Sequence, residues 1–325
     1  MSLAHAFKTL AFNAIGERVR SITGSEASLD DFANPVGDLG LFGPESVAWR
    51  VHAHFTAMMV GGLSSLIVQS LHPRALAAVW DHSDFRHKLK GRLGRTAYFV
   101  AATTYGSQAM ALNAIGRVNA IHAHIRGTDQ QGQPYVANEP DLIRWVHLVE
   151  VSSFLAAYQH LAKQPLSQQE CDRYISEMTQ VGHLLGAVDL PVTHASTQAQ
   201  LRGFAPALSF DARAQEILQV IQAYPTDVLD KPWMALILKC AFDLMPPWVL
   251  ALMGKSPACE VQKQAARLAV RLSAEPVQWM LNEQGVSAIA RQRVRGQPGS
   301  LQPRRMAPGS SPLTAPAQHH VPGRL

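Results

Sequence analysis

The chain has 325 residues, of which 47% are hydrophobic and 16% charged, a composition typical of a globular protein with a large core. The formal net charge of +5 is concentrated at one end: residues 291–325 hold six arginines and no acid, which leaves −1 for residues 1–290. The body is therefore nearly neutral, which argues against a basic nucleic-acid-binding face. The three cysteines are far apart and form no CxxC pair, so neither a disulfide framework nor a structural zinc site is predicted.

The first 20 residues contain no long apolar run and no small-residue cleavage site, and they are typical of a short amphipathic helix rather than a signal peptide. The most apolar stretch, residues 232–253, contains Lys239, Asp243 and two consecutive prolines. Each charge in mid-membrane costs roughly 2.5–3.5 kcal/mol, and the prolines interrupt a helix. We therefore expect a cytoplasmic protein without a transmembrane segment, with peripheral membrane contact left open.

Apolar residues recur at helical spacing along the chain, whereas strand signals are scarce. Residues 1–43 are expected to form an N-terminal helix and the loop leading into the domain. Gly61 and Gly62 are expected to break the first core helix. Pro73 is expected to start a new one, because the residue before a proline avoids helical geometry. Further helices are predicted over residues 92–105, 107–126, 138–162, 167–185, 211–223, 233–244 and 261–282.

Local signals mark several of these helix ends. Ser107 and Asn138 are suited to capping N-termini, and Gly127 to ending the helix that precedes it, with a polar loop over residues 128–137. Residues 291–325 hold six of the twenty prolines and almost no apolar periodicity, so a disordered tail is expected. The prediction is an all-α protein with one multi-helix domain over residues 44–290.

Candidate chemistry is concentrated between residues 72 and 150. His122 shares a predicted helix face with Ile115 and Val118, so its ring should be buried and must form hydrogen bonds or bind a ligand. His124 lies roughly 200° further around the helix, so the two cannot chelate one ion. This geometry suits a single axial ligand better than a zinc cluster. Spacing alone leaves both a hydrogen-bonded core histidine and a ligand open.

Arg92 and Thr96 are one helical turn apart, with Arg95 beside them. Arginines near the start of a helix oppose its dipole, so an anion nearby would help to explain them. A carboxylate of a cofactor or a substrate would serve, and so would a salt bridge to Asp81 or Asp84.

His147 and Glu150 are three residues apart on a predicted helix face. Di-iron bundles use Glu-x-x-His pairs, but here the order is reversed and no second pair completes the set, so a buried hydrogen-bonded pair is favoured over a metal site. The sequence contains no Walker A loop, no G-x-G-x-x-G, no G-x-S-x-G and no H-E-x-x-H. Nothing in it indicates nucleotide binding or hydrolysis.

Five blocks of the sequence carry a resemblance: QSLHP at 69–73, DHSDF at 81–85, GRLGRT at 91–96, IHAHIRGT at 121–128 and DLIRWVH at 141–147. In this order and spacing they resemble the MpaB-type oxygenase family, which includes the latex clearing proteins, the bacterial rubber oxygenases. The similarity covers residues 44–193 and extends more weakly to residue 284.

The resemblance implies helices packed in a globin-like way around a b-type haem, and dioxygen-dependent cleavage of a carbon–carbon double bond in an apolar, isoprenoid-like substrate. His122 matches the axial histidine, and Arg92 and Thr96 match residues of the haem pocket. Arg95 falls where a rubber oxygenase has a lysine that caps the iron, although a protonated arginine is a poor ligand. Arg92, Thr96 and Arg95 are thus the candidate catalytic residues, and Arg126 joins the candidate cofactor-binding set. A haem- or lipid-binding protein without turnover, a different metalloenzyme and a helical protein with a structural histidine are the alternatives.

Overall fold

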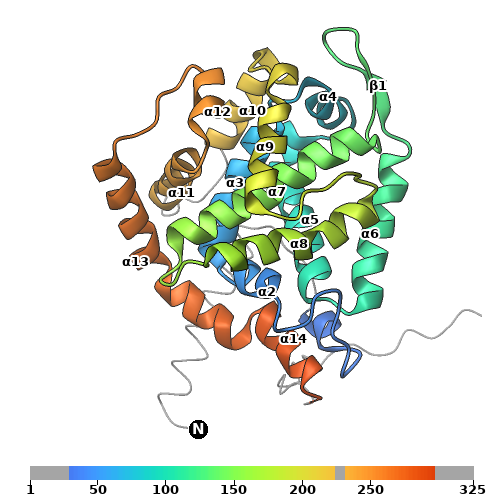
Figure 1. Cartoon of the computed structure of the whole chain (residues 1–325), viewed down its shortest axis with the longest axis vertical. Helices are drawn as coiled ribbons and strands as arrows, with labels where there is room; N and C mark the ends of the chain where they lie inside the picture. Colours follow the sequence, from blue (N-terminus) through green and yellow to red (C-terminus); the bar gives the residue numbers. More distant parts are fainter. Residues whose placement is uncertain (1–28, 224–230, 297–325) are drawn as a thin grey trace, which may run out of the picture.

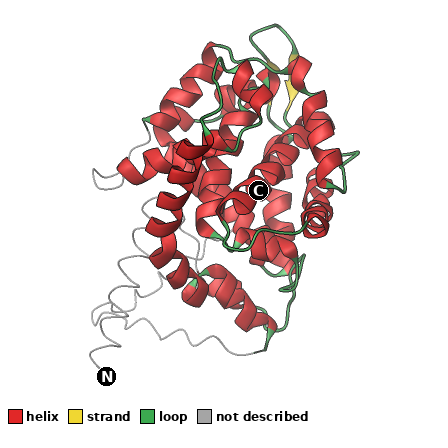
Figure 2. Cartoon of the chain, turned by 60° about the vertical axis from the view of Figure 1, so that its left-hand side comes forward, coloured by secondary structure: helices red, strands yellow, loops and turns green. Residues whose placement is uncertain are grey.

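The computed structural model describes residues 29–223 and 231–296, and these residues form an almost entirely helical assembly (Figures 1 and 2). The predicted all-α fold is confirmed. The amphipathic helix expected over the first 20 residues and most of the tail expected over residues 291–325 lie outside the described residues.

The elements follow one another along the chain with short connections. The first half contains η1 (Leu29–Ala33), α2 (Val47–His52), α3 (Phe55–Gln69), α4 (Pro73–His82), α5 (Phe85–Tyr105), α6 (Gln108–His122), β1 (Arg126–Thr128), β2 (Pro134–Val136) and α7 (Pro140–Leu161). The second half contains α8 (Gln168–Leu185), α9 (His194–Gly203), η2 (Ala205–Ala207), α10 (Ala212–Gln222), α11 (Lys231–Asp243), α12 (Pro247–Leu252), α13 (Glu260–Gln284) and α14 (Val286–Val294).

Helices α3 and α7 pack against each other at the centre of the molecule (Figure 1). The predicted break at Gly61 and Gly62 is wrong, because α3 runs through both glycines and the chain breaks earlier, between α2 and α3. A Cβ atom at Gly61 would lie only 2.9 Å from the Phe154 ring and from the Ser153 carbonyl oxygen. The glycine therefore permits the close helix contact, which offsets its low helix propensity of about 1 kcal/mol.

The end of α6 also differs from the prediction. The helix stops at His122, and Gly127 lies in β1, opposite Tyr135 of β2 in a two-stranded antiparallel hairpin that replaces the expected polar loop. A Cβ at Gly127 would meet the Tyr135 hydroxyl at 2.6 Å, so the glycine serves ring packing rather than helix termination. Local capping was predicted correctly at Ser107, whose side chain accepts a hydrogen bond from the Met110 amide.

Helix α14 continues three residues beyond the predicted start of the tail at residue 291. Arg293 is 1% exposed, and its guanidinium donates hydrogen bonds to the carbonyl oxygens of Phe32, Asp38 and Gly106. The charged side chain thus joins α14 to the first described segment of the chain and to the end of α5.

Among the described residues, no single helix combines the length and hydropathy of a membrane span. Helices α3 and α4 meet the criterion only when taken together, and they are bent by 102° at the His72–Pro73 junction. The cytoplasmic location stays a prediction.

Candidate functional site

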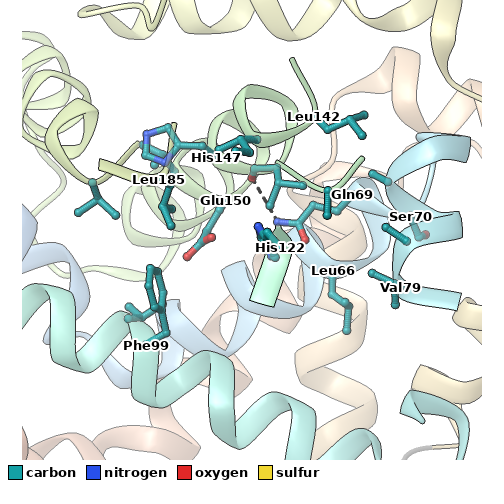
Figure 3. Close-up of a pocket in the computed structure, with 18 of the residues that line it drawn as sticks. Leu66, Gln69, Ser70, Val79, Phe99, His122, Leu142, His147, Glu150 and Leu185 are labelled. Carbon is teal, nitrogen blue, oxygen red and sulfur yellow. Dashed lines mark hydrogen bonds between the residues drawn. The ribbon is translucent and has the colours of Figure 1, made fainter. Parts of the chain in front are cut away.

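A cavity of about 200 Å³ lies between α3, α4, α5, α6, α7 and α8 (Figure 3). Most of the residues on its wall are apolar, and they come from helices far apart in the sequence. The polar or charged lining residues are His52, Gln69, Ser70, Arg92, Thr103, His122, His147 and Glu150. Predominantly apolar walls with a few polar groups are typical of sites for small organic molecules.

His122 is the last residue of α6, and its half-buried ring lines the cavity. Its Nδ1 atom is buried and has no hydrogen-bond partner among the described residues. Burial lowers the pKa of this imidazole, so the ring is neutral at neutral pH. A neutral imidazole is the form that binds metals. The structure therefore shows no hydrogen bond that would make His122 an ordinary core histidine. His124 is exposed and does not line the cavity.

Arg92 of α5 lines the same cavity and donates a hydrogen bond to the Ser83 hydroxyl at 3.2 Å. Burial and the neighbouring Arg95 lower its pKa to about 10, which still leaves the guanidinium charged at neutral pH. In the described part of the chain its charge has no carboxylate partner within ion-pair distance. The possible salt bridge of Arg92 to Asp81 or Asp84 is not formed. Asp81 lies 3.7 Å from Arg213, and Asp84 lies 3.4 Å from Lys88.

The remaining three predicted site residues lie outside the cavity lining. Arg95, Thr96 and Arg126 all have exposed side chains. The Thr96 hydroxyl donates to the Arg92 carbonyl oxygen of its own helix at 3.2 Å. Arg126, in β1, has its guanidinium 3.5 Å from the Ala123 carbonyl oxygen. The structure thus brings together His122 and Arg92 only.

His147 and Glu150 of α7 both line the cavity, but no hydrogen bond or ion pair joins them to each other or to another described side chain. The predicted hydrogen-bonded pair is therefore wrong. Burial raises the pKa of Glu150 to about 7, and burial together with His183 lowers the pKa of His147 to about 4. Among the described residues no three His, Cys, Asp or Glu side chains gather into a group that could hold a metal ion.

Two polar lining residues, His52 and Thr103, were missed in the sequence. His52 has Nδ1 2.7 Å from the Thr104 hydroxyl and Nε2 3.0 Å from the Tyr174 hydroxyl, and burial lowers its pKa to about 3. Both ring nitrogens are thus engaged, in contrast to Nδ1 of His122. No motif marks His52, because its partners are 52 and 122 residues away along the chain.

The fold and site define an all-helical protein with a small apolar cavity that holds a neutral histidine and an arginine. The model of one protein family, described as "ER-bound oxygenase mpaB/B'/Rubber oxygenase, catalytic domain", matches residues 49–274. The match covers more than half of the chain and includes every residue that lines the cavity, and the protein belongs to this oxygenase family. No curated protein and no solved structure matches the chain.

Proposed function

We propose that this protein is a haem b-dependent oxygenase that uses dioxygen to cleave a carbon–carbon double bond in an apolar, isoprenoid-like molecule. The observation that carries the proposal is the neutral His122 ring, whose buried Nδ1 has no protein partner in the described chain and which faces an apolar cavity. The family match adds that the relatives sharing this region are oxygenases.

The residues on the cavity wall suit a haem. His122 would bind the iron, and Arg92, charged and without a carboxylate partner among the described residues, would hold a propionate. One protein ligand would be enough to hold the iron of such a group. The cavity has a volume of about 200 Å³, at the small end of ligand pockets.

When bound, a haem supplies the redox chemistry with dioxygen, and the protein supplies access, orientation and polarity. The apolar walls from α3, α5, α7 and α8 would exclude water and align a hydrocarbon chain. Cleavage of the double bond by one dioxygen molecule gives two carbonyl groups and needs no further reductant. Arg95, Thr96 and Arg126 stay predictions from the family resemblance, since none of them lines the cavity.

The test is the visible spectrum of the purified protein supplied with haem, compared between the wild type, His122→Ala and His124→Ala. We expect a Soret band in the wild type, at least tenfold weaker haem affinity in His122→Ala, and no change in His124→Ala, because His122 lines the cavity and His124 does not. No haem binding by the wild type, or an identical spectrum in His122→Ala, would overturn the proposal.

Oxygen uptake with small terpenoids then separates an enzyme from a binding protein. Haem binding through His122 without oxygen uptake on any alkene tested would favour the alternative of a haem- or lipid-binding protein without turnover.

A further inference from the structure

The wall that α7 contributes to the cavity contains two groups that the proposed haem site does not use. The Glu150 carboxyl forms no hydrogen bond or ion pair with any described residue, and neither does the His147 ring. Several carboxylates elsewhere on the described chain form ion pairs, for example Glu139 with Arg74 and Glu177 with Arg173. Glu150 is partly buried and lines the cavity, where its carboxyl has no partner among the described residues.

The packing around the two side chains holds them at the cavity. His147 lies against α8, where a Cβ at Gly182 would approach its Nε2 and Cδ2 atoms to 2.9 Å, so the glycine leaves room for the ring. In Figure 3 the Glu150 carboxyl points toward the space between Phe99 and His122. Because residues three apart on a helix have Cβ atoms about 5–6 Å apart, one small polar group can lie within reach of both.

A plain hydrocarbon in this cavity would leave both groups without hydrogen bonds in an apolar environment, which is unfavourable. A hydroxyl group avoids this cost, since it can donate to the carboxyl oxygen of Glu150 and accept from an N–H of the neutral His147 ring. Sites built to bind a hydroxyl discriminate strongly against an analogue that lacks it, because the buried polar groups are then unpaired.

We propose that Glu150 and His147 form a hydroxyl-binding subsite, and that the substrate is an apolar alcohol rather than a plain hydrocarbon. The proposal rests on the proposed function in that it names the substrate class of the same cavity. A hydroxyl held at α7 presents the rest of the ligand to the part of the cavity lined by His122 and Phe99.

The experiment measures binding of two probes to the full-length protein by calorimetry, with and without haem. The probes are geraniol and its deoxy analogue 2,6-dimethyl-2,6-octadiene, which differ only in the hydroxyl group. We expect the wild type to bind geraniol at least tenfold more tightly than the analogue. Glu150→Leu should abolish this preference by weakening geraniol and not the analogue, whereas Glu150→Gln, which still forms hydrogen bonds, should keep most of it.

His147→Phe should also reduce the preference, and Glu275→Leu, at an exposed carboxylate on α13, should leave both affinities unchanged. Equal binding of the two probes by the wild type, or binding of neither, would overturn the proposal. So would a Glu150→Leu variant with a native circular dichroism spectrum and an unchanged preference for geraniol. Because binding needs neither iron nor dioxygen, a preference for geraniol without haem binding would support the subsite and exclude the proposed oxygenase function.

Discussion

The inner cavity and the groove between the C-terminal end of α7 and α13 differ in how their charged groups are accommodated. In the groove, Lys163 Nζ lies 2.7 Å from Glu275 Oε1 and Arg50 pairs with Glu170, all with exposed side chains. The cavity wall instead carries Arg92 and Glu150 without ion pairs in the described chain. The groove is the larger of the two, about 690 Å³ against 200 Å³, so size does not identify the functional site.

This difference between cavity and groove shows that a charged group without a partner indicates a ligand site only where the group is shielded from water. Water screens exposed charges, so their pairing contributes little and their presence indicates no ligand. A buried group without a partner is costly, and such groups together with perturbed pKa values are concentrated at functional sites. The comparison can be tested by removing charged groups from each environment.

The largest loss of stability is expected for substitution of Arg293, a buried arginine that is hydrogen-bonded to three backbone carbonyl oxygens. Arg293→Met removes the donor from three carbonyl oxygens, in two buried hydrogen bonds and one partly buried one, and should lower the free energy of unfolding by roughly 4 kcal/mol. The matched control is Arg295→Met, at an exposed arginine two residues further on, which should have little effect. Urea denaturation of both variants measures the difference. A similar stability for the two would contradict the structural role of Arg293.

The second largest effect is expected in the pH dependence of the free energy of unfolding, through the titration of Glu150. Burial raises its pKa from the usual 4.5 to about 7, so the folded protein binds this proton more tightly than the unfolded chain does. The stabilisation is fully present below pH 4.5 and is lost as the pH rises through 7, a change of about 3 kcal/mol. Glu150→Gln should therefore gain stability relative to the wild type by this amount between pH 4.5 and pH 8.

Urea denaturation of both proteins across this pH range gives the difference curve, which also cancels the opposite contribution of His147. The pKa of that histidine is lowered to about 4, so its contribution is lost as the pH falls from 6.5 to 4. A difference that does not vary with pH would show that Glu150 titrates as an exposed carboxylate.

A smaller effect is expected where α7, which carries Glu150, packs on α3. Gly61→Ala places a methyl group 2.9 Å from the Phe154 ring and should cost about 2 kcal/mol through overpacking. Gly62→Ala meets nothing closer than 3.8 Å and should be neutral or slightly stabilising, since alanine favours the helix. Thermal denaturation of Gly61→Ala and Gly62→Ala measures both effects. Equal changes in melting temperature for the two variants would contradict the close α3–α7 contact.

The smallest effect is expected in the groove. Replacing Lys163, Glu275 or both with alanine should leave the melting temperature unchanged within error and should not alter probe binding, because both side chains are exposed and screened. If the double-mutant cycle gave Lys163 and Glu275 an interaction energy as large as the stability change predicted for Glu150, the contrast between groove and cavity would be wrong.

Features that depend on neighbouring residues could be predicted from the amino-acid sequence. Helical periodicity is sufficient to predict the all-α fold, and Ser107 and the His72–Pro73 junction mark helix starts, because capping and proline geometry depend on neighbouring residues only. The order of five short blocks indicated the family that the match over residues 49–274 shows.

Which polar groups lack hydrogen-bond partners depends on how distant segments pack, and the sequence did not predict it. Glu150 and His147 share a helix face but form no bond with each other, and Arg92 and His122 meet at a cavity to which Arg95, Thr96 and Arg126 do not contribute. Gly61 sits inside a helix because a ring from α7 passes over it, and Arg293 is buried because three distant carbonyl oxygens surround its guanidinium. Burial and hydrogen-bond satisfaction depend on segments far apart in the sequence, and no local pattern encodes them.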